Sequence, residues 1–209
     1  MTLTVPCLFG LESLVADEMR RLDLKNVRAE NGRVHCEGTL ADIARLNINL
    51  RCGARVLMEL GSFPARDFEA LFQGVYALRW EDYIPRDGEF PVKGYSLNSQ
   101  LHSVPACQSI VKKASAKRLG EKYGVETLPE SGSRYQIQFS IIKDVATLYL
   151  DTSGEGLYKR GYRAKNRLHK PCRILSVGNC KQKRYRTDSC CHACPEPVSY
   201  THLRAHETC

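Results

Sequence analysis

A short segment near residue 160 combines positive charge with an aromatic ring. Lys159, Arg160 and Arg163 place three cations within five residues, and Tyr162 stands among them. An Arg side chain can bind a phosphate through two hydrogen bonds, a Lys adds a point charge, and a Tyr ring can stack on an unpaired base. The segment therefore predicts contact with RNA, with a solvated linker as the alternative interpretation.

A second group of cations falls in a region whose periodicity predicts a long helix over residues 104–123. Lys112, Lys113 and Lys117 lie within six residues of one another, and the next acidic residue is Glu121. Lys113 and Lys117 are four apart, so their like charges repel across one helical turn unless an anion neutralises them. These lysines predict an anionic partner, and a solvated helix face is the alternative.

One further lysine belongs to the same hypothesis. Lys93 lies in a strand expected over residues 90–95, and we expect it to face the same partner as the helix lysines. The hypothesis is that the cations of the strand, the helix and the segment near residue 160 converge on one surface that holds an RNA backbone.

No metal or catalytic centre is predicted. The residue types of Cys190, Cys191, His192 and Cys194 suit zinc, but adjacent ligands strain a tetrahedral site and no second Cys-x-x-Cys pair completes it. The four cysteines of the first 163 residues are scattered through apolar stretches, where cysteine acts as a small buried apolar residue: Cys7, Cys36, Cys52 and Cys107. No Ser-His-Asp or Cys-His arrangement is visible.

The elements that position these residues follow from periodicity. Over residues 2–63 the pattern predicts the order β-α-β-β-α-β, with Asn31-Gly32 at a hairpin turn and Thr39 as a helix cap. This order is the ferredoxin-like arrangement. After it we expect a helix over 67–78, the strand and long helix already named, Ser103 and Gly124 as caps, and strands over 135–142 and 145–151.

Three stretches resemble one known family. They are the Gly-Leu-Glu at residues 10–12, the run FPVKG at 90–94 followed by CQSIVKKA at 107–114, and DTSGEGLYKRGYR at 151–163. Together they resemble the N-terminal half of the THUMP-domain class I RNA methyltransferases, most nearly the bacterial guanine-N2 methyltransferases of large-subunit ribosomal RNA. The resemblance implies an α+β chain with a ferredoxin-like subdomain over 1–65 and a THUMP RNA-binding domain over 66–163.

The resemblance also implies what the chain should lack. In this family a Rossmann-like domain follows and uses S-adenosylmethionine, but no Gly-rich loop follows residue 163 and no Asn-Pro-Pro tetrapeptide occurs. We therefore expect a truncated recognition module without catalysis or a cofactor of its own. Residues 164–209 should be an irregular tail, since residues 198–208 resemble a translated sequencing adapter.

Composition is consistent with two different parts. Residues 1–163 hold 22 Lys and Arg against 20 Asp and Glu, a net charge of +2, whereas residues 164–209 hold 9 against 3, a net charge of +6. The total of +8 thus permits a nucleic-acid partner without establishing one. No apolar run nears the roughly 20 residues of a membrane span, and no signal peptide is recognisable, so we expect a cytoplasmic protein.

Three functions stay open at this point. The first is recognition of large-subunit ribosomal RNA. The second is the THUMP module of a tRNA-modifying enzyme, and the third is a protein-interaction module, because ferredoxin-like folds carry many functions.

Overall fold

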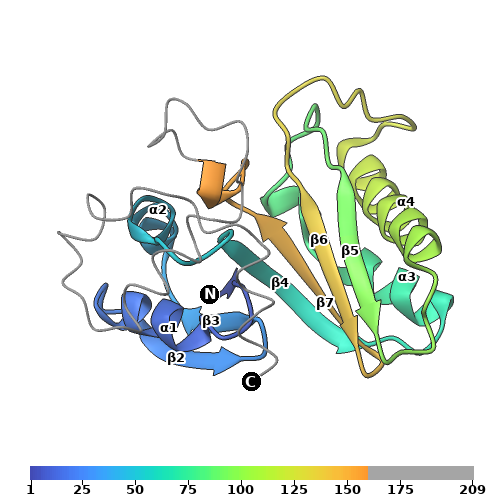
Figure 1. Ribbon diagram of the computed structural model, residues 1–209. Coiled ribbons are helices and arrows are strands. Elements are labelled where there is room, and N and C mark those ends of the chain that lie inside the picture. The colour runs from blue at the N-terminus through green and yellow to red at the C-terminus, as the bar shows by residue number, and fades with distance from the viewer. Residues whose placement is uncertain (160–209) are drawn as a thin grey trace. The chain divides into compact units, whose positions relative to one another are not determined.

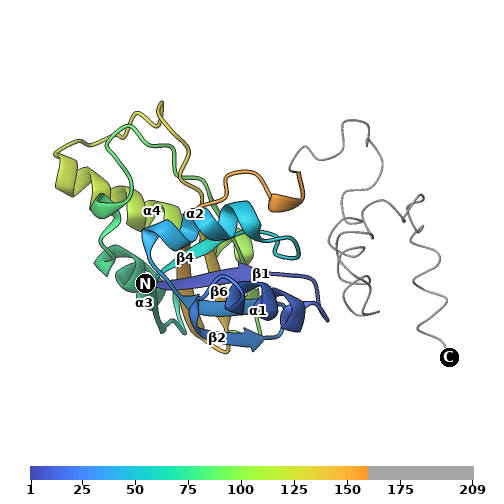
Figure 2. The same ribbon diagram turned by 90° about the vertical axis from the view of Figure 1, so that its left-hand side faces the viewer.

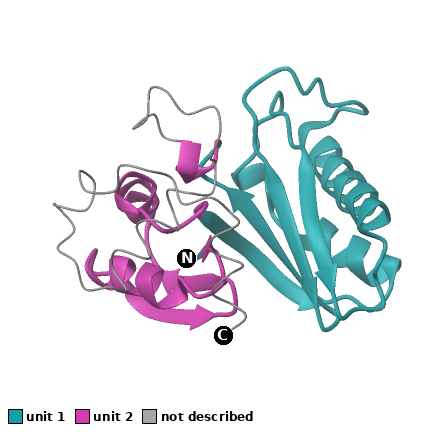
Figure 3. Ribbon diagram, viewed as in Figure 1, with its two compact units in different colours: residues 1–4, 57–154 teal, residues 5–56, 155–209 magenta. Residues whose placement is uncertain are grey.

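The computed structural model describes residues 1–159. They divide into two compact units (Figure 3). Unit 1 contains residues 1–4 and 57–154, and unit 2 contains residues 5–56 together with those from 155 onward. Strand β1 (Thr2–Pro6) begins in unit 1 and ends in unit 2.

Unit 2 is built from two helices and a hairpin. Helix α1 (Glu12–Arg20) is followed by β2 (Lys25–Glu30), β3 (Arg33–Glu37) and α2 (Leu40–Asn49), with the short 3₁₀ turn η2 (Leu157–Lys159) at the end of the described chain. Glu30 pairs with Arg33 across the Asn31-Gly32 turn, and Gly32 adopts a φ of 74° that favours glycine. Thr39 forms a full capping box with Asp42, so the predicted cap is confirmed.

Two glutamates of α1, Glu12 and Glu18, hold loops of unit 2 in place through hydrogen bonds to backbone N–H groups. Glu12 accepts hydrogen bonds from the backbone N–H groups of Gly10 (2.8 Å) and Gly32 (2.9 Å), which ties the loop before α1 to the hairpin turn. Glu18, almost fully buried, accepts hydrogen bonds from the backbone N–H groups of Arg51 (2.9 Å) and Cys52 (3.2 Å). The sequence gives no sign of these roles, because Gly32 and Arg51 lie 20 and 33 residues from the glutamates that bind them.

Unit 1 is a sheet with helices on one side (Figures 1 and 2). Its elements are β4 (Leu57–Pro64), α3 (Phe68–Ala77), the 3₁₀ turn η1 (Trp80–Asp82), β5 (Val92–Leu97), α4 (Val104–Tyr123), β6 (Ile137–Ile142) and β7 (Val145–Asp151). The strand order is β4-β7-β6-β5, with the start of β1 beside β4. Only β5 and β6 of these pairs run parallel, because α4 provides the crossover between them.

The register of the sheet separates its two faces. Phe139 of β6 is paired with Gly94 of β5 and Leu148 of β7, and it packs in the core with Val111 and Ala114 of α4. Residues in register share a face, so these positions lie beneath the helices. Side chains that alternate with them along each strand therefore point to the opposite side of the sheet.

The predicted fold class and element order are confirmed, with differences at particular residues. The long helix covers 104–123 as expected and ends at Gly124, whose φ is 64°. Ser103 precedes this helix, but its side chain makes no capping hydrogen bond, which corrects the predicted cap. Strand β4 pairs with β7 along its whole length, so residues 57–64 pack in the same compact unit as residues 65–154, while the domain boundary expected at residue 65 stays a prediction.

Candidate nucleic-acid interface

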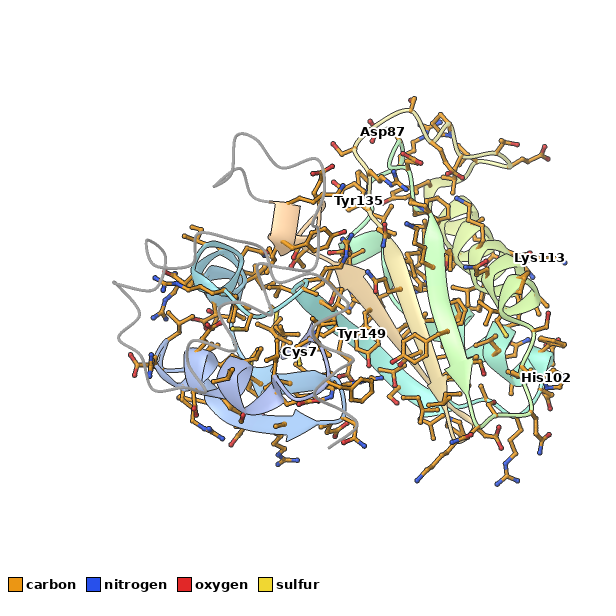
Figure 4. All side chains as sticks on the ribbon, in the orientation of Figure 1. Cys7, Asp87, His102, Lys113, Tyr135 and Tyr149 are labelled. Carbon is orange, nitrogen blue, oxygen red and sulfur yellow. The ribbon has the colours of Figure 1, made fainter. Side chains whose placement is uncertain are left out.

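The lysines of α4 fall on different sides of that helix. Cys107, Val111, Ala114 and Leu119 are buried against the sheet, so the outward stripe is the exposed series Ser109, Lys113, Lys117 and Glu121. Figure 4 shows Lys113 on the outer side of α4, pointing away from the strands. Within residues 1–159 this lysine forms no ion pair or hydrogen bond through its side chain, and it is therefore able to bind an external anion.

Lys112 has a different environment, because its ammonium already has protein acceptors. Its Nζ lies 2.7 Å from both carboxylate oxygens of Glu130 and 3.2 Å from the carbonyl oxygen of Phe90. The same nitrogen lies 3.6 Å from the centroid of the Phe90 ring. Lys112 thus fastens the loop after α4 to the segment before β5, and its predicted contact with RNA would have to compete with these bonds.

Lys117 lies among aromatic side chains. Its Nζ is 5.9 Å from the ring centroid of Phe72 and 5.6 Å from that of Tyr76, and these two rings of α3 are stacked 6.2 Å apart. The charge itself stays exposed. Phe68, one turn earlier on α3, is 42% exposed. Phe68 and Phe72 recur at helical spacing with the buried Leu71 and Val75, but Phe68 is exposed and Phe72 is only partly buried against the core.

An acidic residue restrains the cations near the end of α4. Glu81 of η1 accepts hydrogen bonds from Arg118 (2.8 and 3.3 Å), and Lys122 lies 3.8 Å away. The hydrogen bond from the Arg118 guanidinium lowers the pKa of Glu81 to about 2. Tyr76 donates a hydrogen bond to Glu121 on the same surface. Arg118 and Lys122 are therefore partly neutralised, which leaves Lys113 and Lys117 as the available charges of α4.

Lys93 lies on the other side of unit 1. It is paired with Gln138 of β6, which alternates with the core residues Ile137 and Phe139, so Lys93 points away from the helices. Lys113 points outward from the helix layer on the opposite side. These two lysines therefore do not share one face of unit 1, contrary to the single convergent surface expected from the sequence.

The remaining predicted contacts belong to unit 2 or lie beyond the described chain. Lys159 closes η2 and forms an exposed ion pair with Glu155 at 3.0 Å. Arg160, Tyr162 and Arg163 lie outside the described residues, as do the cysteines and histidine that had been considered for zinc. Among residues 1–159 there is no group of three or more His, Cys, Asp or Glu side chains able to hold a metal ion.

The described cysteines agree with their expected role. Cys36, Cys52 and Cys107 are buried free thiols, and Cys7 is half-buried. Burial raises the pKa of Cys7 and of Cys36 to about 11, so neither is a thiolate near neutral pH. No helix within residues 1–159 is both long and apolar enough to cross a membrane.

Comparison with known proteins matches two stretches of the chain to domain families. The RlmL ferredoxin-like domain matches residues 2–57, and the THUMP domain matches residues 65–151. Residues 65–151 thus match a THUMP domain. The order of the two matches is the order inferred from the sequence.

The relatives of this THUMP-domain chain are named as methyltransferases. It is 42% identical over 164 residues to the putative RNA methyltransferase YpsC of Bacillus subtilis, an alignment that covers 78% of this chain and 42% of the relative. It is 32% identical over 162 residues to the ribosomal RNA large subunit methyltransferase K/L of Pseudomonas aeruginosa, covering 77% of this chain and 22% of the relative.

A solved structure supports the fold. SMU.472, a putative methyltransferase complexed with SAH, superposes with a TM-score of 0.81 at 38% identity, over 90% of this chain and 50% of that one. The THUMP-domain chain thus spans half or less of the length of these relatives.

Proposed function

We propose that this chain is the RNA-recognition part of a methyltransferase that modifies large-subunit ribosomal RNA. The observation that carries the proposal is the THUMP domain over residues 65–151, in a chain whose relatives are named as RNA methyltransferases. Lys113, exposed and without an ion pair among the described residues 1–159, and the neighbouring Lys117 supply charges suited to phosphate. The proposed place of action is the cytoplasm, where ribosomal RNA is modified in bacteria.

In the intact relatives the methyl donor would be S-adenosylmethionine, which supplies the transferred methyl group. Residues 1–159 do not fit this cofactor. The connection from the parallel strand β5 to α4 is where a nucleotide-binding fold places a Gly-rich turn. Here the turn carries Ser99 and Gln100. The Asp144 carboxylate accepts hydrogen bonds from the Ser99 hydroxyl (2.7 Å) and from the backbone N–H of Gln100 (2.8 Å). We therefore assign the cofactor to a catalytic domain and not to these residues.

The experiment is a binding titration of the 209-residue chain with a structured fragment of large-subunit ribosomal RNA at several salt concentrations. The observed association constant should fall steeply as salt rises, because each neutralised phosphate releases counterions. Replacing both Lys113 and Lys117 with Gln should weaken binding and reduce the slope by about two phosphate contacts. A matched control is the pair Arg45→Gln and Arg79→Gln, whose charges already have acidic partners.

Two results would count against this function. One is the absence of binding at low salt. The other is equal or tighter binding of a tRNA competitor, which would favour the tRNA-modifying alternative. A partner protein captured with no dependence on salt would favour the interaction module instead.

A further inference from the structure

The side of the unit 1 sheet away from the helices carries an exposed row on its outermost strand. Along β5, the side chains that alternate with the core-facing Val92 and Gly94 are Lys93, Tyr95 and Leu97. Tyr95 is 46% exposed and Leu97 is 55% exposed. Leaving an aromatic and an aliphatic side chain in water on a flat strand costs free energy, which a bound partner would recover.

Residues in register with this row continue across the sheet on the same face, where Ser140 of the neighbouring strand is buried. Tyr95 is paired with Ser140, which pairs with Thr147, and Thr147 lies 3.1 Å from Ser62 of β4 through their hydroxyl oxygens. Two residues further along β5, Leu97 is paired with Ile142 of β6, which in turn is paired with Val145 of β7. Val145 is 43% exposed. We call the set Lys93, Tyr95, Leu97, Thr147 and Ser62 the sheet platform.

We propose that the sheet platform binds unpaired nucleotides of RNA, an inference that rests on the proposed function. Tyr95 offers a ring for a base to stack on, and Lys93, two residues away on the same face, offers a charge for its phosphate. The hydroxyls of Thr147 and Ser62 can bond a ribose or a base edge. A base within a duplex already stacks on its neighbours, so the platform selects an unpaired one.

The charges of this face favour RNA over a protein partner. Lys93 has no hydrogen bond or ion pair within residues 1–159, and the carboxylate of Glu59 lies on β4, three strands and about 14 Å away. The Asp151 carboxylate is occupied by the Gln138 amide at 3.1 Å. Lysine and serine are depleted from the cores of protein interfaces, whereas a cation beside a ring is the usual composition of a single-strand site.

The position of β5 also allows one RNA to reach both Lys113 on the outward stripe of α4 and Lys93 on the sheet platform. This strand is the edge of the unit 1 sheet, and α4 packs against it. A duplex on the outward stripe of α4 can therefore continue around this edge as a single strand onto the platform. Lys93 and Lys113 then contact different segments of one RNA instead of one groove.

The test compares two RNAs bound to the full 209-residue chain: a blunt hairpin, and the same hairpin with an unpaired extension of about five nucleotides that contains 2-aminopurine. The unsubstituted chain should bind the extended RNA about tenfold more tightly, the worth of one or two stacked bases. Tyr95→Ala should abolish that advantage and leave blunt-hairpin binding unchanged. The control Tyr95→Phe keeps the ring and should keep both the advantage and the quenching of 2-aminopurine fluorescence.

Each outcome assigns success or failure to one idea. No binding to either RNA overturns the proposed function itself. Equal binding of the two RNAs, or an advantage that persists in Tyr95→Ala, overturns the platform while the proposed function stands. If Tyr95→Ala lowers the melting temperature, Tyr95→Leu, which keeps apolar volume without a ring, and Lys93→Gln carry the same expectation. Salt-independent self-association that Tyr95→Ala abolishes would identify the face as a protein contact and overturn the proposal.

Discussion

Lys112 and Lys113 are neighbours with the same charge, yet the structure gives them different tasks. Lys112 is held by Glu130 and by the carbonyl and ring of Phe90, whereas Lys113 faces outward with no partner among residues 1–159. Sequence spacing gives the helical stripe of each lysine, but it cannot show that a loop acceptor from residue 130 reaches only one of them.

The first prediction concerns this pair. Lys112→Met should lower the free energy of unfolding by about 1–2 kcal/mol, because Glu130 and the Phe90 carbonyl lose their donor. Lys113→Met, the matched control, should change it by less than about 0.5 kcal/mol. Urea denaturation of both variants measures the difference, and equal stability of the two would show that the Glu130 contact contributes nothing.

The second prediction is a pH dependence at Glu81. Its pKa is lowered to about 2 by the Arg118 hydrogen bond, so the ionised group contributes stability that is complete above the ordinary Glu pKa of about 4.5. That contribution to stability is lost as the pH falls from about 4.5 to the lowered pKa of about 2. Glu81→Gln should therefore be less stable than the unsubstituted chain at pH 7, by about 1–2 kcal/mol, and the gap should close near pH 2.

Denaturation of both chains at pH 7, 4.5 and 2.5 tests this expectation. Glu126→Gln serves as the control, because Glu126 is exposed in the loop after α4. A gap between Glu81→Gln and the unsubstituted chain that stays constant over this range would contradict the role of the ionised carboxylate.

At the scale of elements, α4 is the helix whose ends were best predicted, and its C-terminus depends on backbone conformation. Gly124 adopts a φ of 64°, and an added Cβ would meet open space, so any cost of substitution comes from the left-handed backbone alone. The N–H of Gly124 caps the Gly120 carbonyl. The left-handed backbone conformation of Gly124 therefore determines where the helix ends.

The third prediction follows from that geometry. Gly124→Ala should destabilise the chain by about 1 kcal/mol, and Gly124→Asn should recover part of the loss, because asparagine tolerates the left-handed region better than alanine. Thermal melts followed by circular dichroism check the order Gly, Asn, Ala. Melting temperatures that do not follow this order would show that the φ of residue 124 is not what limits the helix end.

Helix α3 shows why an apolar period overestimates burial. Phe68, Leu71, Phe72 and Val75 satisfy one helical face, but only Leu71 and Val75 are buried, while Phe68 stays 42% exposed. Periodicity reports the direction of a side chain around its own axis. How far the neighbouring helix covers that direction depends on where α4 packs, and that is a tertiary property.

At the scale of the whole molecule, the excess charge lies mostly outside the described residues, as the +2 and +6 net charges of its two parts show. The cations that leave the last described turn are Lys159, Arg160 and Arg163, of which only Lys159 is described. Replacing these cations with acidic residues therefore distinguishes RNA binding that depends on them from RNA binding that depends on unit 1.

The fourth prediction is that replacing Lys159, Arg160 and Arg163 together with Glu weakens RNA binding and flattens its dependence on salt. Repulsion replaces attraction at up to three phosphates, so the loss should exceed that of Lys113→Gln and Lys117→Gln combined. Titrations at matched salt concentrations measure it. If the charge-reversed variant binds RNA as tightly as the unsubstituted chain, this segment is not part of the interface.

The sequence alone determined the elements and their order, because helical and strand periods and turn residues are local properties. The two domain families were implied by the resemblance of three sequence stretches to a known family. The sequence also identified Thr39 and Gly124 as caps, since capping involves only nearby backbone groups. Tertiary structure decided which cations are available. Lys93 and Lys113 lie on opposite sides of one sheet-and-helix layer, and Lys112 is bound by a residue 18 positions away. Such facts depend on strand register and on long-range packing, which no local pattern encodes.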